Sequence, residues 1–410
     1  MQINNLLRAL RKHNELKKDT ERNMMIGALA KKKRRKLGMT QSDVADSICS
    51  ISYLSKIETN KIVANRDCLR LLMERVNIPS WEINVLENGT DILEKGVSCI
   101  YSLDVAGYDE IMEDLSSVEG NQCVDVIKLG YYILKNDIKN AKTIIQNNLE
   151  LTSSMEDSFL YVFSYFTSEY LYLVKDYEQA LLIANDSSII HRDDTLKTLF
   201  EDLKFRIYAS TKRPMEAAEI YRNLLHKYTE ELEVRRISYL IITMAKLALN
   251  EGAYEQAIML TYSLDSFGEM TDSSLYNYII GSSFFSLKKE ITAKEYLEKI
   301  ETTSPYFDLA LDKLLKVLPN HEDFIVKAKE KSITSPSPFL DIFINEQMNT
   351  VKASFYNSDA FESSLSNYDF YDRIFLLRKK SRYLMSISHY KEACLINETI
   401  EELSQRFSLS

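Results

Sequence analysis

A short sequence motif recurs along the C-terminal three quarters of the chain. Three copies are Lys175–Ala180, Gly252–Ala257 and Ser388–Ala393, and weaker copies place an alanine at positions 141, 217 and 293. From position 141 to position 293 the alanines are 39, 37, 40 and 36 residues apart. The gap of 100 residues before Ala393 leaves room for two degenerate units. Units of this length bury their apolar faces only against each other, so neighbouring units must stack.

A small residue accompanies the motif, 12 positions before the alanine, in four copies: Ser168, Ala245, Gly281 and Ser381. Helices that cross closely need small side chains at their contact. This pair of positions resembles the tetratricopeptide repeat, and the resemblance implies a right-handed helical solenoid with a concave channel. The period exceeds the usual length of about 34 residues, so we expect longer helices or turns. Leu129 and Phe205 occupy the small position in two copies, which we expect to be degenerate or terminal.

The composition favours an all-α fold. The 410 residues include only 10 Gly and 6 Pro, too few for the many turns of a sheet-rich protein. Four prolines lie between positions 305 and 338, where we expect the regular repeat to break. We find no apolar run long enough to cross a membrane and no apolar signal region. The five cysteines are scattered and lack paired spacing, which predicts a protein of the reducing cytoplasm.

The net charge of −9 conceals an asymmetry. Residues 1–80 contain 17 Lys and Arg against 8 Asp and Glu, a balance of +9. The rest of the chain contains 34 against 52, a balance of −18. We therefore expect only the N-terminal part to contact a polyanion.

Residues 24–84 have the pattern of four or five short helices. The first is expected over residues 24–37, with a cationic end at Lys31–Lys36 and a stop at Gly38. Thr40, followed by Asp43, predicts the capped start of a helix over residues 41–48. A third helix is expected over residues 51–58, and Asn65 can cap a fourth. The tight turn between the second and third helices is typical of a helix-turn-helix unit.

Residues 38–61 resemble the Cro/repressor-type, or XRE, helix-turn-helix family. The matching residues are Gly38, Thr40, Gln41, Val44, Ala45, Ile48, Leu54, Ser55, Ile57 and Glu58. The turn is one residue shorter than usual and contains Ile48 and Cys49, which resembles the branch found in peptide-pheromone receptors. The resemblance also implies that Arg34 pairs with Glu58.

The helix-turn-helix assignment predicts a DNA-binding surface, because the third helix of this fold lies in the major groove. We expect Ser50, Ser52, Tyr53 and Lys56 to contact base edges, and Gln41, Lys61 and Arg35 to contact phosphates. Residues 1–23 form a basic, helical leader that contacts DNA, pairs with a second subunit or is disordered; the sequence does not decide among these. We expect a linker over residues 85–100 and the repeat domain over residues 101–410, for peptide binding and dimerisation.

Counting along the better repeats predicts which side chains line the concave channel. They are Tyr165, Glu169, Arg206, Tyr239, Lys246, Asn250, Tyr278, Ser282, Arg378 and Arg382. Asn can bond both backbone groups of an extended peptide, Lys and Arg can hold a carboxylate, and Tyr offers a ring with a hydroxyl.

We find no catalytic constellation. The chain lacks a phosphate-binding loop, a dinucleotide fingerprint, a zinc-protease motif and a nucleophile elbow, and its five His are far apart. We therefore expect neither an enzyme nor a metal or cofactor site.

The two halves together resemble the RRNPP family of intracellular pheromone receptors, which includes Rgg, PlcR, NprR and PrgX. The resemblance implies a quorum-sensing transcription regulator that binds an operator as a homodimer or higher oligomer and is controlled by a short signalling peptide. It implies a cytoplasmic protein with no membrane contact. The alternative is an adaptor whose repeats bind another protein and whose head only anchors it to DNA. The operator, the peptide and the direction of regulation are not predicted.

Overall fold

The computed structural model describes residues 3–15, 24–59, 61–62, 66–78, 89–115, 122–155, 157–188, 194–267, 272–317, 326–327, 329–330, 365 and 370–409. These residues form α-helices, two short 3-10 helices and turns, and no strand occurs among them. The all-α prediction is confirmed. The chain divides into two compact units, Met1–Leu203 and Lys204–Ser410, whose boundary lies within one helix, α13 (Asp194–Ser210).

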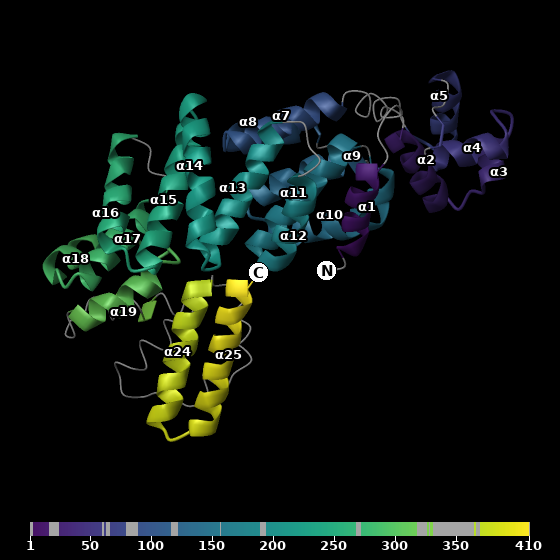
Figure 1. The fold of residues 1–410 in the computed structure, drawn as a ribbon. Coiled ribbons are helices and arrows are strands. Elements are labelled where there is room, and N and C mark those ends of the chain that lie inside the picture. The colour runs from purple at the N-terminus through teal and green to yellow at the C-terminus, as the bar shows by residue number, and fades with distance from the viewer. Residues whose placement is uncertain are drawn as a thin grey trace. The chain divides into compact units, whose positions relative to one another are not determined.

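The head of the first unit is a helix-turn-helix domain (Figure 1). Its helices are α2 (Met24–Lys36), α3 (Gln41–Ala45), α4 (Ile51–Glu58) and α5 (Arg66–Arg75). One apolar cluster joins them, with Val44, Leu54, Leu72 and Val76 almost completely buried. The predicted cap at Asn65 lies outside the described residues.

The start of α3 is capped as predicted, but its end is not where we expected. The Thr40 hydroxyl accepts the Asp43 N–H, and the Asp43 carboxylate accepts the Thr40 N–H. The helix ends at Ala45 instead of position 48. The reason is the backbone of Ser47, which is left-handed with a φ of 58°, so the amides of Ile48 and Cys49 both return to the Ala45 carbonyl.

Six helical hairpins carry the repeat motif. In the first unit they are α9 (Gln122–Leu134) with α10 (Ile138–Asn148), and α11 (Asp157–Leu173) with α12 (Tyr177–Ser188). α13 is followed by α14 (Pro214–Glu230). The second unit contains α15 (Val234–Asn250) with α16 (Tyr254–Ser263), α17 (Ser273–Ser286) with α18 (Glu290–Leu297), and α24 (Phe370–Ser386) with α25 (Tyr390–Leu409).

All six motif alanines are buried, at positions 141, 180, 217, 257, 293 and 393. The small residues 12 positions earlier are buried as well. Leu129 and Phe205, which replace the small residue in two hairpins, are also fully buried, so these hairpins accommodate a larger side chain at that position. The two-residue spacing therefore marks helix contacts, as the sequence predicted.

The turn inside each hairpin has the same backbone. The residue five positions before the alanine is left-handed in all six, at Asn136, Lys175, Lys212, Gly252, Lys288 and Ser388. At Lys288, for example, the amide bonds the Phe285 carbonyl and the next amide bonds the Phe284 carbonyl, which is a Schellman motif. Only one of the six residues is glycine, so the tertiary packing of the hairpins holds five L-residues in this conformation.

Three further helices complete the described chain. α7 (Gly89–Tyr101) packs on α9 and on α8 (Val105–Asp114) through Leu93, Val97 and Ile100. The segment predicted as a linker over 85–100 is therefore helical from residue 89 onward. In the second unit, α19 (Phe307–Val317) follows a turn that contains Pro305. The other three prolines of the predicted break lie outside the described residues.

The N-terminal leader forms α1 (Asn4–Glu15). It contacts α11, α12 and the 3-10 helix η1 (Leu149–Ser154) of the repeat body. Of the three alternatives left open for the leader, the described part is therefore an ordered helix docked on its own chain.

Candidate functional site

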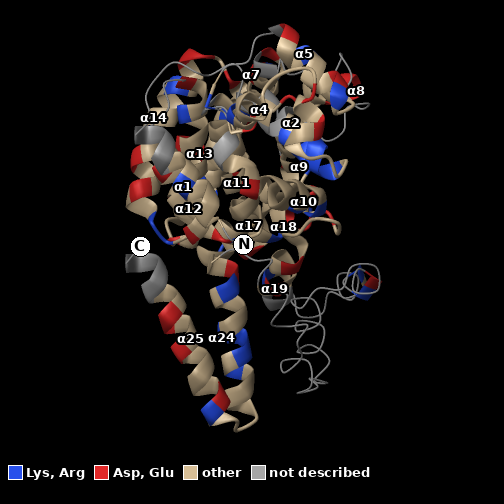
Figure 2. Cartoon of the chain, turned by 90° about the vertical axis from the view of Figure 1, so that its right-hand side faces the viewer, with Lys and Arg blue, Asp and Glu red and all other residues tan. Residues whose placement is uncertain are grey.

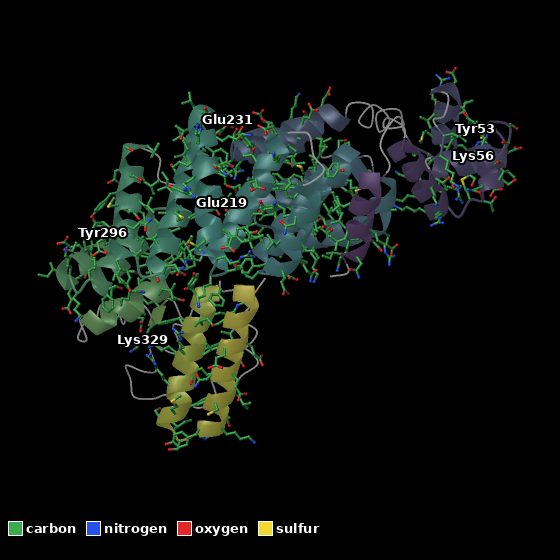
Figure 3. The ribbon with its side chains drawn as sticks, viewed as in Figure 1. Tyr53, Lys56, Glu219, Glu231, Tyr296 and Lys329 are labelled. Atoms are coloured by element: carbon green, nitrogen blue, oxygen red, sulfur yellow. The ribbon has the colours of Figure 1, made fainter. Side chains whose placement is uncertain are left out.

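The exposed face of α4 carries most of the predicted base-reading residues. Ser52 and Lys56 are exposed, and Ile51 beside them exposes half of its surface. Figure 3 shows Tyr53 and Lys56 on this helix. Tyr53 is partly buried against the apolar core of the head. The face thus offers hydroxyl, ammonium and apolar groups, which are the kinds of group that contact base edges.

Ser50 has a structural duty in the helix start. It is the N-cap of α4, and its hydroxyl accepts the Tyr53 N–H over 3.1 Å. Replacing a cap hydroxyl costs about 1 kcal/mol of stability. The side chain remains exposed, so its predicted contact with DNA and its cap coexist on one residue.

Gln41 lies in a different position from the one predicted for a phosphate ligand. Its amide donates to Glu58 Oε2 over 2.8 Å. Arg34 donates to the same carboxylate through Nε at 2.6 Å and Nη2 at 2.9 Å, and its Nη1 donates to the Met39 carbonyl. The Arg34–Glu58 pair is therefore present as expected, and Gln41 is the third member of its network.

The network determines the charge state of Glu58, whose side chain is almost completely buried. Burial by itself would raise the pKa of this carboxyl, but the hydrogen bonds from Arg34 and Gln41 outweigh it, and the pKa is lowered. Glu58 is therefore ionised at neutral pH and ties α2, α3 and α4 together.

The predicted phosphate contacts outside this network are exposed cations. Arg35, at the end of α2, and Lys61, just after α4, are both exposed. Figure 2 shows the basic residues of α2 in blue. Four cations occupy the last turn of that helix, where they also oppose the helix dipole favourably.

In the first unit, the predicted channel residues Tyr165 and Glu169 face each other on α11. The Tyr165 hydroxyl donates to Glu169 Oε1 over 2.6 Å, and both side chains are buried. The Tyr165 ring also packs edge-on against Phe200, with the centroids 5.4 Å apart. In this conformation the two residues serve packing and offer little surface to a ligand.

In the second unit, two predicted residues join a stack of rings and cations. The rings of Tyr278 and Tyr306 are stacked, with centroids 5.3 Å apart. Lys246 Nζ lies 5.3 Å from the Tyr306 centroid, and Lys313 Nζ lies 4.8 Å from the Tyr278 centroid. Lys313 also donates to the Tyr278 hydroxyl over 3.2 Å. The four residues, from α15, α17, α19 and the turn before α19, are called the lysine–tyrosine cluster below.

Sequence reasoning missed Tyr306 and Lys313. Lys313 is 35 residues after Tyr278, which is close to one repeat period. Extending the repeat count past Pro305 would have found it, but α19 lacks the alanine motif that served as the marker.

The remaining predicted residues divide by exposure. Ser282 is completely buried and its hydroxyl has no hydrogen-bond partner, so in this conformation it cannot reach a ligand. Arg206 is also buried, whereas Tyr239 and Asn250 are partly exposed.

Arg378 and Arg382 lie one turn apart on α24 and are exposed. The neighbouring Lys379 pairs with Asp312 of α19, with 3.2 Å between Nζ and Oδ1. Tyr371 of the same helix donates a hydrogen bond to Glu251. These contacts bring the basic helix α24 to α19 and to the end of α15, within the second unit.

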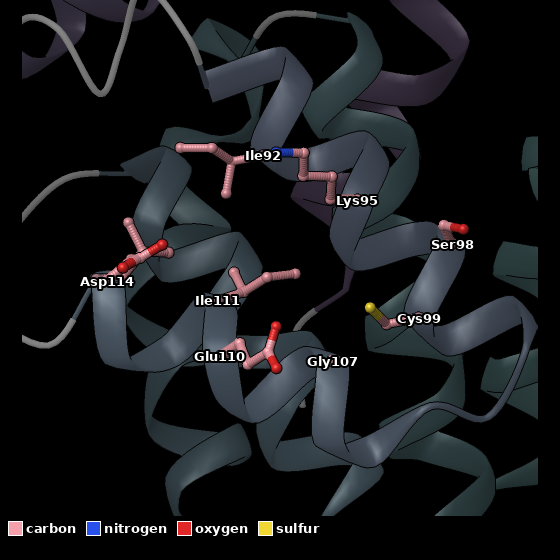
Figure 4. A pocket seen from close by; sticks show the side chains of 9 residues that line it. Ile92, Lys95, Ser98, Cys99, Gly107, Glu110, Ile111 and Asp114 are labelled. Carbon is pink, nitrogen blue, oxygen red and sulfur yellow. The ribbon is translucent and has the colours of Figure 1, made fainter.

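A separate pocket of about 400 Å³ lies between α7 and α8 (Figure 4). Its lining is mixed and consists of Ile92, Lys95, Ser98, Cys99, Gly107, Glu110, Ile111, Asp114 and Leu115. None of the predicted site residues lines it.

The described residues contain no group of His, Cys, Asp or Glu arranged to hold a metal ion. Among the same residues, no helix is both long and apolar enough to span a membrane.

Comparison with known proteins supports the two-part organisation. Residues 31–80 match the family model HTH_3, described as helix-turn-helix. The transcriptional activator NprA of Geobacillus stearothermophilus is 26% identical over 230 residues. That match covers 52% of this chain and 56% of NprA, so the chain spans little more than half the length of this relative.

Two solved structures share the fold. A Rap protein complexed with competence and sporulation factor has a TM-score of 0.59 and 15% identity, and the apo form of the quorum sensor NprR from B. thuringiensis has 0.56 and 14%. Each match covers 78% of this chain and 99% of the other. With its helix-turn-helix head, its helical-repeat body and its sequence relative, the chain belongs to the RRNPP family.

Proposed function

We propose that the protein is a DNA-binding transcription regulator whose activity is controlled by a short peptide bound to the repeat body. The single observation that carries the proposal is the joining, in one chain, of a helix-turn-helix with an exposed polar α4 to a helical-repeat body whose fold is shared by a quorum sensor. The relative NprA carries the name of a transcriptional activator. The proposal includes a cytoplasmic, non-enzymatic protein.

The DNA-binding half is supported by charge and by geometry. The head has a balance of +9, while the rest of the chain is acidic. We assign base contacts to Ser52, Tyr53 and Lys56, with Ser50 acting also as a cap. Arg35 and Lys61 neutralise phosphates, a contribution that weakens with salt. Gln41 is proposed to position α3 against α4 through Glu58, with any phosphate contact secondary to that role.

The peptide-binding half is supported by the lysine–tyrosine cluster. Two stacked rings flanked by two ammonium groups offer a flat apolar surface next to positive charge. Such a surface suits a peptide that carries a carboxylate, at its C-terminus or on a side chain. We place Tyr239, Asn250, Arg378 and Arg382 at the same site as further contacts, and we leave Tyr165, Glu169, Arg206 and Ser282 as packing residues unless the ligand opens them.

A peptide can control DNA binding if the regulator is a dimer. Two heads must match half-sites about 34 Å apart, or a multiple of that distance. A peptide that binds one arrangement of the repeats more tightly shifts the population of head spacings by its difference in affinity.

The experiment has two arms. In the first, the full chain selects duplexes from a random pool, and the enriched sequence is bound at rising salt concentration; a salt-sensitive, sequence-specific complex supports the proposal, and its absence rejects the DNA half. In the second, pools of synthetic pentapeptides are added in a thermal-shift assay. A rise in Tm at micromolar peptide supports the receptor, and no response from any pool rejects it.

A second candidate, the protein-binding adaptor, is favoured by one observation. Met215 and Ile291 occupy the same repeat position, two residues before the alanine, and each exposes 80% of its surface. Exposed apolar residues at equivalent positions suit a protein partner. A partner that co-purifies stably with the chain, together with no peptide response, would favour this candidate.

A further inference from the structure

The leader helix α1 is bound to the repeat body through one apolar face. Ile3, Leu6, Leu7 and Leu10 have the spacing of a single helical stripe and are all buried, with Leu6 and Leu10 at 0% exposure. On the opposite face, Asn4, Asn5 and Arg8 are exposed. The apolar face is therefore not available to solvent in this conformation.

The partner surface on the body is formed by three elements of the first unit. α1 contacts η1, α11 and α12. Within and just after η1, Leu149 and Met155 are buried, and the Thr152 hydroxyl is satisfied by the Leu149 carbonyl. Helix α2 of the head contacts η1 and α9 as well. The head is thus held to the body at two places, one before and one within the DNA-binding domain.

The two surfaces that this docking brings together differ in charge. Residues 1–80 have a balance of +9, whereas residues 81–203, the remainder of the same unit, contain 8 Lys and Arg against 23 Asp and Glu, a balance of −15. Exposed charges interact over about 10 Å at 0.1 M salt. A body of this charge attracts the head and repels the phosphates of a duplex that approaches it.

We propose that α1 is a clamp: it occupies a docking surface formed by η1, α11 and α12 of its own chain, keeps the basic head next to the acidic body, and so lowers the affinity of the head for DNA. Release of the clamp exposes the head to DNA without changing any residue that contacts DNA. The inference about affinity rests on the proposed DNA binding, whereas the docking itself does not.

The test compares two double variants of the full chain. Leu6→Glu with Leu10→Glu places two carboxylates in the buried stripe. Asn4→Glu with Asn5→Glu adds the same charge to the exposed face of the same helix and is the matched control. Leu6→Ala with Leu10→Ala weakens the same contact without charge and serves if the glutamate variant does not fold.

Hydrogen exchange measures the docking directly. We expect faster exchange in residues 149–154 and in α12 for the leucine variants, with the control unchanged. Exchange that stays the same in the leucine variants would overturn the clamp. Loss of a dimer on gel filtration, seen only in the leucine variants, would overturn docking on the same chain, because α1 would then be held by a second copy.

Binding to a fluorescent 20-base-pair duplex of random sequence measures the consequence. At 50 mM salt we expect the leucine variants to bind at least about threefold more tightly than the control, and at 300 mM salt we expect the difference to vanish, because screening removes the effect of the body. Equal or weaker binding at low salt would overturn the inhibitory role. If exchange responds while no variant binds DNA, the docking surface stands and the proposed DNA-binding function fails.

Discussion

The backbone of Ala293 passes so close to Gly281 that no side chain fits between them. A Cβ atom on Gly281 would lie 3.2 Å from the Ala293 carbonyl oxygen and 2.7 Å from Cγ of Leu297 on the same helix. The two small residues that recur 12 positions apart in the sequence are therefore the crossing point of α17 and α18. The spacing is maintained by steric contact between two helices.

Gly281→Ala is expected to destabilise the second unit. Alanine favours a helix over glycine by about 1 kcal/mol, but forcing a methyl group into a packed crossing costs about 1–3 kcal/mol. We expect a net loss, measured as a lower midpoint in urea unfolding. Ser286→Ala, at an exposed position of the same helix, is the control and should change little. A stabilised Gly281→Ala protein would show that the crossing is looser than the distances indicate.

Lys288→Gly is expected to stabilise the same hairpin. Lys288 has a φ of 59°, a region that glycine adopts without steric cost. Relief of the left-handed strain should contribute about 1 kcal/mol, partly offset by the greater freedom of the unfolded chain. Lys288→Val, with a branched Cβ at the same position, should do the opposite. Thermal unfolding of the two variants checks the contrast, and equal midpoints would contradict it.

Acid should weaken the head through Glu58. Because its pKa is lower in the folded state than in the unfolded chain, where it is about 4.3, the carboxylate stabilises the fold fully above that value and loses this effect as the pH falls below it. Glu58→Gln should cost about 1–3 kcal/mol at pH 7. Calorimetry at pH 7, 5 and 3.5 should show the difference between the two proteins shrinking toward the lowest pH. A constant difference would argue against the network.

Lys56 and Lys61 should have separable roles in DNA binding. Lys56→Ala removes a group from the exposed face of α4 and should reduce discrimination at one base pair by about 1–3 kcal/mol. Lys61→Ala should weaken binding to all sequences and lower the slope of log affinity against log salt by about 1. Anisotropy titrations with the selected site and a scrambled site distinguish the two. Identical behaviour would mean that α4 does not present Lys56 to the bases.

The lysine–tyrosine cluster should govern the response to a peptide carboxylate. In the protein with Lys246→Gln and Lys313→Gln, we expect the Tm increase given by pentapeptide pools with a free C-terminus to be largely lost. Pools with an amidated C-terminus should act weakly on the unmodified chain. Lys294→Gln with Lys299→Gln, on α18, removes the same charge elsewhere and should leave the response intact. A response to both kinds of pool, unchanged by the first variant, would remove the cluster from the site.

Much of the head could be predicted because its determinants are local. The Thr40–Asp43 cap lies within four residues, and the apolar positions of α4 follow the helical period. The end of α3 was misplaced because the left-handed Ser47 has no strong sequence marker. Gln41 was misassigned because its partner, Glu58, is 17 residues away and competes with any phosphate for the same amide.

The sequence by itself determined the all-α class, the basic head, the hairpin register and the burial of the motif alanines, since each follows from short-range periodicity and from composition. Tertiary packing alone decided which predicted channel residues are covered, which lysines meet Tyr278 and Tyr306, and where α1 docks. Those outcomes depend on contacts between helices far apart in the chain, and a side chain's surroundings there are set by the helices that pack around it, which no local pattern records.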